Sequence, residues 1–404
     1  MIERKHLSVI KNRIENEPRR FIQVLSGPRQ VGKSTIIKQF VESTTIPFVQ
    51  YNGEEQSLNS EAWISQIWET ARLNFKLKEL KELIIIIDEI QAIPDWSLKI
   101  KKEWDFDTLH NINIKVVVLG SSQLLLMKGL NESLAGRFEN IYINHWSYQE
   151  VKEAFGMSEN EYVWFGGYPG SLSLRDDYQR WKSYIRYSII DAVIKKDILL
   201  LTRVHKPALL ENLFMIGCRY SSKILSYNKI MGQLQDAGNT TTLAHYLSLL
   251  DNAGLLSGLD KFSGASYVGQ RNSSPKFMVQ NTAFIGATSN LSLEEAMFSH
   301  ETWGNYVEST IGAHFINFSK IHGYEVLYWR QNNDEVDFIL KTDQKVIAIE
   351  VKSGRVGKLN GMNSFLKQFS PDKVILPPTR FHGKTPYLLT PFNYFNFNIL
   401  SYTG

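Results

Sequence analysis

The feature that most constrains the fold is a short glycine-containing stretch near the amino terminus. Residues 27–34 have the sequence GPRQVGKS and fit the spacing G-x-x-x-x-G-K-[ST]. Residues 20–25 before it predict a short strand, and residues 34–40 after it predict the start of a helix. Glycines let such a loop curl so that its N–H groups point at a phosphate, and the helix N-terminus adds partial positive charge. The stretch therefore predicts a phosphate-binding loop in an α/β domain.

This loop gives its residues distinct expected roles. We expect Lys33 to reach the β- and γ-phosphates of ATP and the Ser34 hydroxyl to ligate Mg²⁺. The residues expected to contact the nucleotide are Gly27, Pro28, Arg29, Gln30, Val31, Gly32, Lys33, Ser34 and Thr35. The alternative is a glycine turn that matches by chance, and the strand and helix on either side weigh against it.

A second apolar stretch, residues 83–87, ends in two carboxylates, Asp88 and Glu89. An uninterrupted apolar run predicts a strand buried on both faces, as in a parallel sheet, and ligands bind where such strands end. We expect Asp88 to hold Mg²⁺, directly or through water, and Glu89 to activate the attacking water. The alternative is that the two acids only cap the following turn.

A third apolar strand is predicted at residues 115–119, and two hydroxyl residues follow it. Ser121 and Ser122 would lie near the γ-phosphate and sense it, although capping of the next helix explains each of them equally well. Arg137 follows a short predicted helix and is a candidate arginine finger, a residue that stabilises charge during phosphoryl transfer. The alternative for Arg137 is an ordinary surface side chain.

Together these segments resemble the AAA-type ATPases of bacteria and archaea in the P-loop superfamily, over residues 20–175. The matching pieces are GPRQVGKS at 27–34, IDEIQ at 87–91, GSS at 120–122, SLAGR at 133–137 and GGYP at 166–169. The resemblance implies an ATPase whose nucleotide site is completed by Arg137 of a neighbouring copy, which makes a homo-oligomer the candidate assembly.

The middle of the chain predicts helices followed by a hairpin. Residues 181–201 predict a connecting helix, and Pro207 opens a new segment. Three helices and the start of a β-wing are predicted at residues 208–219, 226–234, 240–250 and 254–259. This is a winged-helix pattern, whose last helix can enter the major groove of DNA. The face of that helix is polar rather than basic, so contact with DNA and contact with a protein both stay open; its residues are Thr240, Thr241, Thr242, His245 and Ser248.

The last segment contains a second group of charged residues. Strands are predicted at 336–340 and 345–352, and the period-two alternation places Glu350 and Lys352 on one face of the second strand. Asp337 on the neighbouring strand would complete a Mg²⁺ site with Glu350, and Lys352 would orient or deprotonate a water beside the metal. Glu308 lies at the edge of an upstream helical stripe.

The order of helix, Asp and Glu-x-Lys resembles the restriction-endonuclease-like fold, with its motif PD-(D/E)xK, over about residues 300–355. Two positions depart from the resemblance: Val336 replaces the usual proline, and Asn281 ends a segment that usually ends in aspartate. The resemblance implies a nuclease-like fold, and the alternative is a solvated strand on which Glu and Lys happen to alternate.

Charge and composition limit the possible partners. Lys and Arg number 45 against 41 Asp and Glu, and the net charge of +4 permits nucleic-acid contact without arguing for it. The single cysteine, Cys218, excludes a disulfide within the chain and a cysteine zinc site. No apolar run is long enough to span a bilayer and no signal core is present, so we expect a cytoplasmic protein with no membrane partner.

We predict an α/β chain in four parts: an AAA-type P-loop core at 1–155, a helical connector at 156–205, a winged helix at 206–270 and a PD-(D/E)xK-like α/β domain at 271–404. The first functional hypothesis is an ATP-hydrolysing protein that couples nucleotide state to a DNA-directed winged-helix and nuclease-like module. The alternative is a nucleotide-gated protein-binding switch whose nuclease-like domain is inert. The intact Asp337, Glu350 and Lys352 favour the first.

Overall fold

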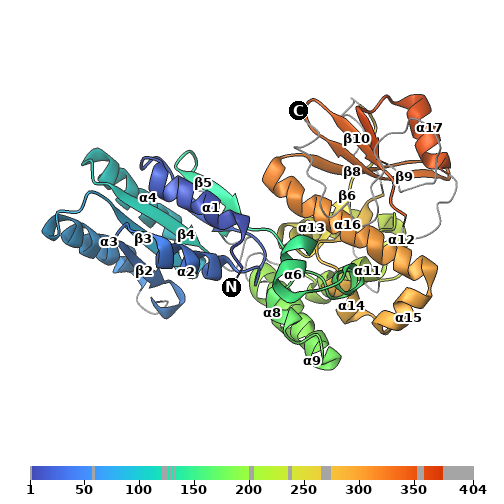
Figure 1. The fold of residues 1–404 in the computed structure, drawn as a ribbon, viewed down its shortest axis with the longest axis horizontal. Coiled ribbons are helices and arrows are strands. Elements are labelled where there is room, and N and C mark those ends of the chain that lie inside the picture. Colours follow the sequence, from blue (N-terminus) through green and yellow to red (C-terminus); the bar gives the residue numbers. More distant parts are fainter. Residues whose placement is uncertain are drawn as a thin grey trace. The chain divides into compact units, whose positions relative to one another are not determined.

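The computed structural model describes residues 2–56, 60–120, 126–127, 129–130, 133–199, 204–234, 239–264, 274–352 and 359–375. The chain divides into two compact units, with the first ending at Asn144 and the second beginning at His145 (Figure 1). The predicted division into four parts stays a prediction, and the two units are described separately below.

The first unit is built on a five-stranded sheet in which every paired strand is parallel. The strand order is β2-β3-β4-β1-β5, with bounds β1 Ile22–Ser26, β2 Phe48–Asn52, β3 Leu83–Asp88, β4 Ile114–Leu119 and β5 Phe138–Tyr142. The chain crosses from β1 to β2 at one edge and later from β4 past β1 to β5 at the other. The sheet therefore has its topological switch point at β1, where ligands bind in open α/β sheets. The predicted parallel α/β sheet is confirmed.

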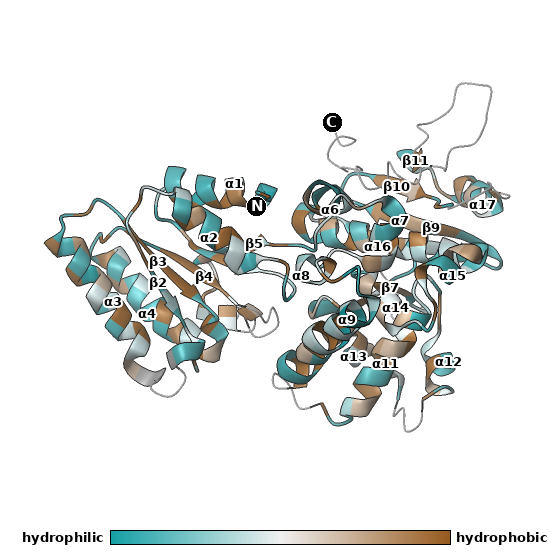
Figure 2. Cartoon of the chain, turned by 60° about the horizontal axis from the view of Figure 1, so that its bottom comes forward, coloured by the Kyte–Doolittle hydropathy of each residue, from teal (hydrophilic) through white to brown (hydrophobic). Residues whose placement is uncertain are grey.

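Helices cover both faces of this sheet because alternate residues of its buried strands point in opposite directions. Ile85 and Ile87 of β3 pack in one core with the helices α3 and α4, whereas Ile84 and Ile86 pack in a second core with α1 and α2. The helical segments are α1 Lys5–Lys11, η1 Asn12–Asn16, α2 Lys33–Ser43, η2 Glu54–Gln56, α3 Ser60–Leu77, η3 Ile90–Ala92 and α4 Trp96–Leu109. Figure 2 shows the apolar strands between helices that carry hydrophilic residues.

The second unit begins with helices and continues into three helices and a hairpin. The opening segments are α6 Tyr148–Phe155, α7 Glu159–Phe165, α8 Pro169–Leu172, α9 Tyr178–Ser183 and η4 Tyr184–Ile198. The following segments are α11 Pro207–Arg219, α12 Tyr227–Met231, α13 Thr240–Asn252, β6 Leu256–Leu259 and β7 Lys276–Val279. Strands β6 and β7 are antiparallel, and Ile224 forms an isolated antiparallel bridge with Lys276. Asn239 caps α13, because its side-chain oxygen accepts a 2.8 Å hydrogen bond from the Thr242 N–H.

The rest of the second unit is a mixed four-stranded sheet between helices. Its order is β11-β10-β9-β8, antiparallel except for the parallel pair β10 and β11. The long helix α16 packs on one face through Ile311 and Phe315, and α17 packs on the other through Met362 and Phe365. The bounds are α14 Ala283–Thr288, α15 Leu293–Phe298, α16 His300–His322, β8 Glu325–Gln331, β9 Asp334–Lys341, β10 Val346–Ile349, α17 Asn360–Gln368 and β11 Lys373–Ile375.

Candidate functional site

The predicted phosphate-binding loop joins β1 to α2 and has the backbone that its glycines allow. Gly27 and Gly32 have φ angles of 139° and 97°, and Gln30 between them also has a positive φ of 57°. A Cβ atom on Gly27 would lie 2.1 Å from the carbonyl oxygen of Ile143, so this position accepts only glycine. Gly32 is the N-cap of α2, which therefore starts at Lys33 and directs its first N–H groups toward the loop.

Lys33 is buried, and its ammonium group lies inside the curve of the loop. Nζ donates hydrogen bonds of 2.9 Å to the carbonyl oxygen of Gly27 and 2.7 Å to that of Pro28. Ser34 and Thr35 are exposed on the first turn of α2. The sequence-predicted loop residues are thus gathered around one concave backbone turn, with a cation at its centre.

Ser34 meets Asp88 at the carboxyl edge of the sheet. The Ser34 hydroxyl donates a 2.8 Å hydrogen bond to Oδ2 of Asp88, and Oδ1 of the same carboxylate accepts one of 2.8 Å from the Glu89 N–H. Burial raises the pKa of Asp88 above its ordinary value, while the bond from Ser34 opposes that rise. Hydroxyl and carboxylate oxygens are the ligands that Mg²⁺ takes, so this pair fits a nucleotide-bound magnesium ion.

Glu89 is held in an unusual backbone conformation beside a glutamine. Its φ of 50° is in the left-handed region, and its carboxylate accepts a hydrogen bond from the side-chain amide of Gln91. The Gln91 side chain in turn lies against Gly120, where a Cβ atom would come within 2.0 Å of its Oε1. Sequence reasoning gave Gln91 no role. The only signal for one was its position two residues after Glu89.

A hollow of about 410 Å³ opens beside Asp88. It is lined by Gln50, Tyr51, Asn52, Glu55, Trp63 and Asp88. Asn52 is the last residue of β2 and is the register partner of Asp88 in β3, which places both at the carboxyl edge. The polar residues Gln50 and Asn52 near the end of β2 were the sequence signal for this wall of the hollow, and sequence reasoning did not use them.

Arg137 lies at the amino ends of the strands, opposite to the carboxyl ends where the phosphate-binding loop lies. Its carbonyl oxygen accepts a 2.8 Å hydrogen bond from Ile22, the first residue of β1, whereas the phosphate-binding loop follows the last residue of that strand. Its guanidinium forms hydrogen bonds of 2.8 and 3.1 Å with the carboxylate of Asp105 in α4. The fold thus keeps Arg137 away from the loop of its own chain. The predicted sensors Ser121 and Ser122 lie outside the described residues.

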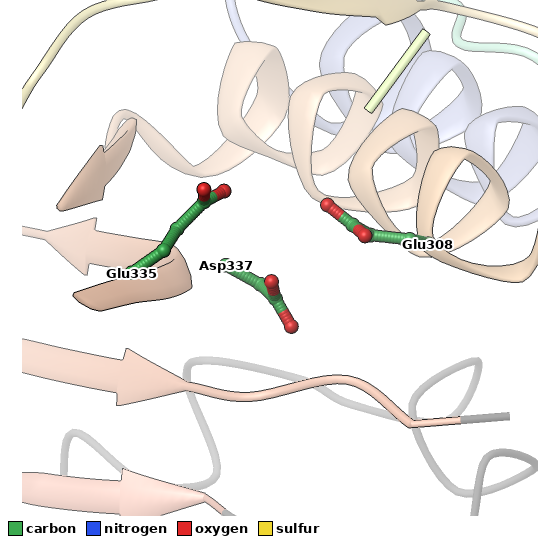
Figure 3. Close-up of side chains that lie close together, drawn as sticks. All are labelled: Glu308, Glu335 and Asp337. Atoms are coloured by element: carbon green, nitrogen blue, oxygen red, sulfur yellow. The ribbon is translucent and has the colours of Figure 1, made fainter. Parts of the chain in front are cut away.

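A cluster of carboxylates forms a second candidate site in the second unit (Figure 3). Glu308 extends from α16, and Glu335 and Asp337 extend from β9, with ligand oxygens that all lie within 4.8 Å of one another. Glu350 and Lys352 follow β10, with Lys352 Nζ 2.5 Å from Oε1 of Glu350. Oδ2 of Asp337 accepts a 2.7 Å hydrogen bond from the Val351 N–H, which ties β9 to this segment.

Lys276 of β7 lies within this cluster and was missed by sequence reasoning. Its side chain is 0% exposed, and Nζ lies 2.7 Å from Oε1 of Glu308 and 2.9 Å from Oε1 of Glu335. Nζ also donates a 3.2 Å hydrogen bond to the carbonyl oxygen of Asp337. The sequence gives little sign of this role, because a lysine in an apolar strand does not reveal which acidic residues will surround it in the fold.

Burial shifts the acid–base properties of the cluster. Burial raises the pKa of Glu308 to about 7 and that of Glu350 to about 8, and the nearby lysines oppose both shifts. Burial lowers the pKa of Lys276, but the carboxylates of Glu308, Asp337 and Glu335 outweigh it and hold that pKa well above its ordinary value. The four carboxylates and two ammonium groups carry a formal excess of two negative charges when all are ionised, which a divalent cation would balance.

Asn281 has a structural place in the second unit. Its Oδ1 accepts hydrogen bonds of 3.2 Å from Gly167 and 3.1 Å from Ala283, and its Nδ2 lies 3.2 Å from Nδ1 of His145. A Cβ atom on Gly166 would come within 2.0 Å of Oδ1 of Asn281. The residue therefore holds the GGYP segment at 166–169 in place.

Three further expectations from the sequence concern the exposed face of α13, the single cysteine and the membrane. The face of α13 that carries Thr240, Thr241, His245 and Ser248 is exposed, with Thr242 partly buried. Cys218 is buried, and burial raises the pKa of its thiol far above the ordinary range. Within the described parts of the chain, each helix is too short or too polar to cross a membrane.

Comparison with known families divides the chain into three matched regions. Residues 19–152 match a family described as AAA domain. Residues 157–295 match the domain of unknown function DUF8612, and residues 303–381 match the domain of unknown function DUF4143. The first match and the parallel sheet identify the first unit as a nucleotide-binding, AAA-type P-loop ATPase domain. The other two matches assign no activity.

Individual relatives add little to this assignment. An uncharacterized protein of Haemophilus influenzae is 24% identical over 355 residues, which cover 82% of this chain and 82% of the relative. Among solved structures, the ORC1 protein of Aeropyrum pernix in complex with DNA is 12% identical with a TM-score of 0.30, covering 70% of this chain and 91% of that one. A structure described for katanin self-assembly is 23% identical with a TM-score of 0.27, covering 39% and 50%. Scores this low establish no common fold.

Proposed function

We propose that this protein binds and hydrolyses ATP with Mg²⁺ and couples nucleotide state to a DNA-directed, nuclease-like module in its second unit. The observation that carries the ATPase part is the 2.8 Å hydrogen bond between Ser34 and Asp88 beside a loop centred on Lys33. That arrangement gathers a phosphate-binding cation, two magnesium ligands and a carboxylate at one edge of the sheet. Phosphoryl transfer needs this combination of positioning and charge stabilisation.

Each residue of the site has a step in the proposed hydrolysis. Lys33 would leave the loop carbonyls and bind the β- and γ-phosphates, together with the N–H groups of the loop. Mg²⁺ held by Ser34 and Asp88 would neutralise charge on those phosphates. Glu89 would accept the proton of the attacking water, and Gln91 would keep its carboxylate oriented.

Arg137 is proposed to act on the site of a neighbouring copy. Its place at the amino edge of the sheet supports action in trans, because the length of β1 separates it from the loop of its own chain. The ion pair with Asp105 holds the guanidinium in a defined position at that edge. An arginine supplied from a second copy would make hydrolysis depend on assembly.

We propose that the three helices and the hairpin of the second unit form a winged helix. The order α11, the bridge at Ile224, α12, α13, β6 and β7 supports this proposal. The exposed face of α13 would meet DNA through polar side chains such as Thr241 and Ser248. Filter binding to duplex DNA at two salt concentrations tests this part, and absence of salt-sensitive binding would count against it.

The nuclease-like part of the proposal is supported by the carboxylate cluster. The order α16, β8, β9, β10, α17, β11 gathers Glu308, Asp337, Glu350 and Lys352 at one place on the mixed sheet. Carboxylates from a helix and two strands would hold Mg²⁺, and Lys352 would orient or deprotonate a water beside it. Plasmid nicking with Mg²⁺ or Mn²⁺ by the wild type, lost in Lys352→Ala, is the expected result. Equal nicking by both would remove this assignment.

A second candidate function is a nucleotide-gated protein switch whose nuclease-like domain is inert. One observation favours it: Lys276 already supplies a positive charge to Glu308 and Glu335. Absence of nicking by the wild type under every metal and nucleotide condition, with ATPase activity intact, would favour this second candidate.

A further inference from the structure

We propose that the ammonium group of Lys276 is an internal cation that competes with divalent metal for the carboxylate cluster and so weakens metal binding in the wild-type chain. The inference rests on the proposed metal site and adds its regulation. Lys276 is not one of the residues of the helix–Asp–Glu-x-Lys motif. It belongs to β7, which pairs with β6 and is not part of the mixed four-stranded sheet.

The geometry of Lys276 matches that of a bound cation. Nζ donates hydrogen bonds of 2.9 Å to Oε1 of Glu335 and 3.2 Å to the Asp337 carbonyl oxygen, and it lies 2.7 Å from Oε1 of Glu308 in an ion pair. Oδ1 of Asp337 lies 3.8 Å away and completes a ring of negative charge. Because the side chain is 0% exposed, water screens these attractions little.

A divalent ion that binds these oxygens beside Lys276 is destabilised by repulsion between the two positive charges. A magnesium or manganese ion bonded to Oε1 of Glu308 at about 2 Å would stand within a few ångströms of Nζ. Two cations at that separation in a buried site repel strongly, so one must leave or both bind weakly. Metal binding therefore requires that Nζ withdraw or that the ion use only the carboxylates farther from it, Asp337 and Glu350.

The hairpin strand β7 fixes the position of this lysine. Lys276 pairs with Leu259 of β6 and bridges Ile224, and Met278 of the same strand packs against Gly312 of α16. A Cβ atom on Gly312 would come within 2.5 Å of the Met278 sulfur, so helix and strand are in close contact. The hairpin strand β7 therefore contributes a charged side chain to the proposed metal site.

Manganese binding to the full chain tests the competition. Every protein carries Asp88→Asn, so that the nucleotide site contributes little, and titration calorimetry with MnCl₂ is run without nucleotide. We expect Lys276→Met to bind Mn²⁺ at least tenfold more tightly than its parent, and we expect Asp337→Asn to abolish that gain. Lys115→Met is the matched control, because Lys115 is a buried lysine paired with Glu82 in the first unit, and its loss should leave Mn²⁺ affinity unchanged.

A second variant covers the case in which Lys276→Met does not fold. Lys276→Met with Glu335→Gln removes one cation and one neighbouring anion, which keeps the charge balance of the cluster and leaves Glu308, Asp337 and Glu350 as ligands. It too should bind Mn²⁺ more tightly than the parent. Unchanged or weaker affinity in the folded variant overturns the inference.

The nicking assay separates this result from the proposed activity. Tighter Mn²⁺ binding without nicking would keep the inference and remove the nuclease proposal. Nicking by the wild type with unchanged Mn²⁺ affinity in the lysine variants would keep the nuclease proposal and overturn the inference about Lys276.

Discussion

The hydroxyl of Ser34 and the carboxylate of Asp88 are joined by a 2.8 Å hydrogen bond although 54 positions separate them in the sequence. Ser34 is in the first turn of α2 and Asp88 is the last residue of β3, and β4 lies between β1 and β3 in the sheet. The pair brings the phosphate-binding loop and the carboxylates of β3 into one site. The first three predictions follow from this arrangement.

Replacement of Lys33 by alanine should abolish ATP turnover. The variant loses the ammonium group that donates hydrogen bonds to two carbonyl oxygens of the loop, and the β- and γ-phosphates lose their positive partner. Phosphate release is the measurement, with Lys38→Ala as the control, because Lys38 is an exposed lysine on the same helix. An unchanged turnover rate in Lys33→Ala would remove the site assignment.

Replacement of Glu89 by glutamine should leave ATP binding intact and slow hydrolysis at least about 100-fold, the usual effect of losing a general base. Glutamine keeps the shape of the side chain but cannot accept the proton of the attacking water. Fluorescent-nucleotide binding and phosphate release measure the two properties separately. Normal hydrolysis by the variant would show that Glu89 is not the base.

Arg137→Ala should also keep nucleotide binding and lose turnover. Mixing the Arg137→Ala and Glu89→Gln variants should restore part of the lost activity. In mixed oligomers, Arg137→Ala subunits provide an intact Glu89, and Glu89→Gln subunits provide an intact arginine. If Arg137 acts on a neighbouring copy, the mixture should recover part of the wild-type rate, whereas each variant alone stays inactive. A mixture no more active than its components would argue against action in trans.

Loss of the Asn281 amide should destabilise the second unit by about 1–3 kcal/mol, the usual effect of leaving buried polar groups unpaired. In Asn281→Leu the N–H groups of Gly167 and Ala283 lose their acceptor. Urea unfolding followed by tryptophan fluorescence measures this change. Asn252→Ala, an exposed position on α13, is the control and should change stability far less.

The stability of the metal-free protein should fall as pH rises from about 5 to about 8. Burial raises the pKa of Glu350 to about 8 from an ordinary value of 4.5, so the folded state keeps a proton that the unfolded state has released. The stabilisation is fully present below the unfolded pKa and is lost as pH rises through the folded one.

This group contributes at most about 1.4 kcal/mol per pH unit to the slope. Thermal unfolding across this range should show a flatter profile for Glu350→Gln than for the wild type. Glu325→Gln, at an exposed acid on β8, should keep the wild-type profile. Identical slopes in all three proteins would refute the assignment to Glu350.

Several features of this protein were determined by its sequence alone, because they depend on neighbouring residues. The run at 83–87 predicts a strand buried on both faces, and the structure confirms β3 there. The glycines of the loop predict a backbone that curls around a phosphate, and Gly27 and Gly32 have positive φ angles in the structure. The helical spacing of Leu243, Tyr246, Leu247 and Leu250 predicts a helix with one apolar face, and all four are buried in α13.

Tertiary structure decided which remote groups meet. Local periodicity does not encode strand order, and strand order is what places Ser34 beside Asp88 and Arg137 at the far edge of the sheet. The sequence predicted Glu308, Asp337, Glu350 and Lys352 as one group, but it gave no sign that Lys276 would enter their cluster. A buried charge takes its partners from whatever elements pack around it, and that packing exists only in the folded chain.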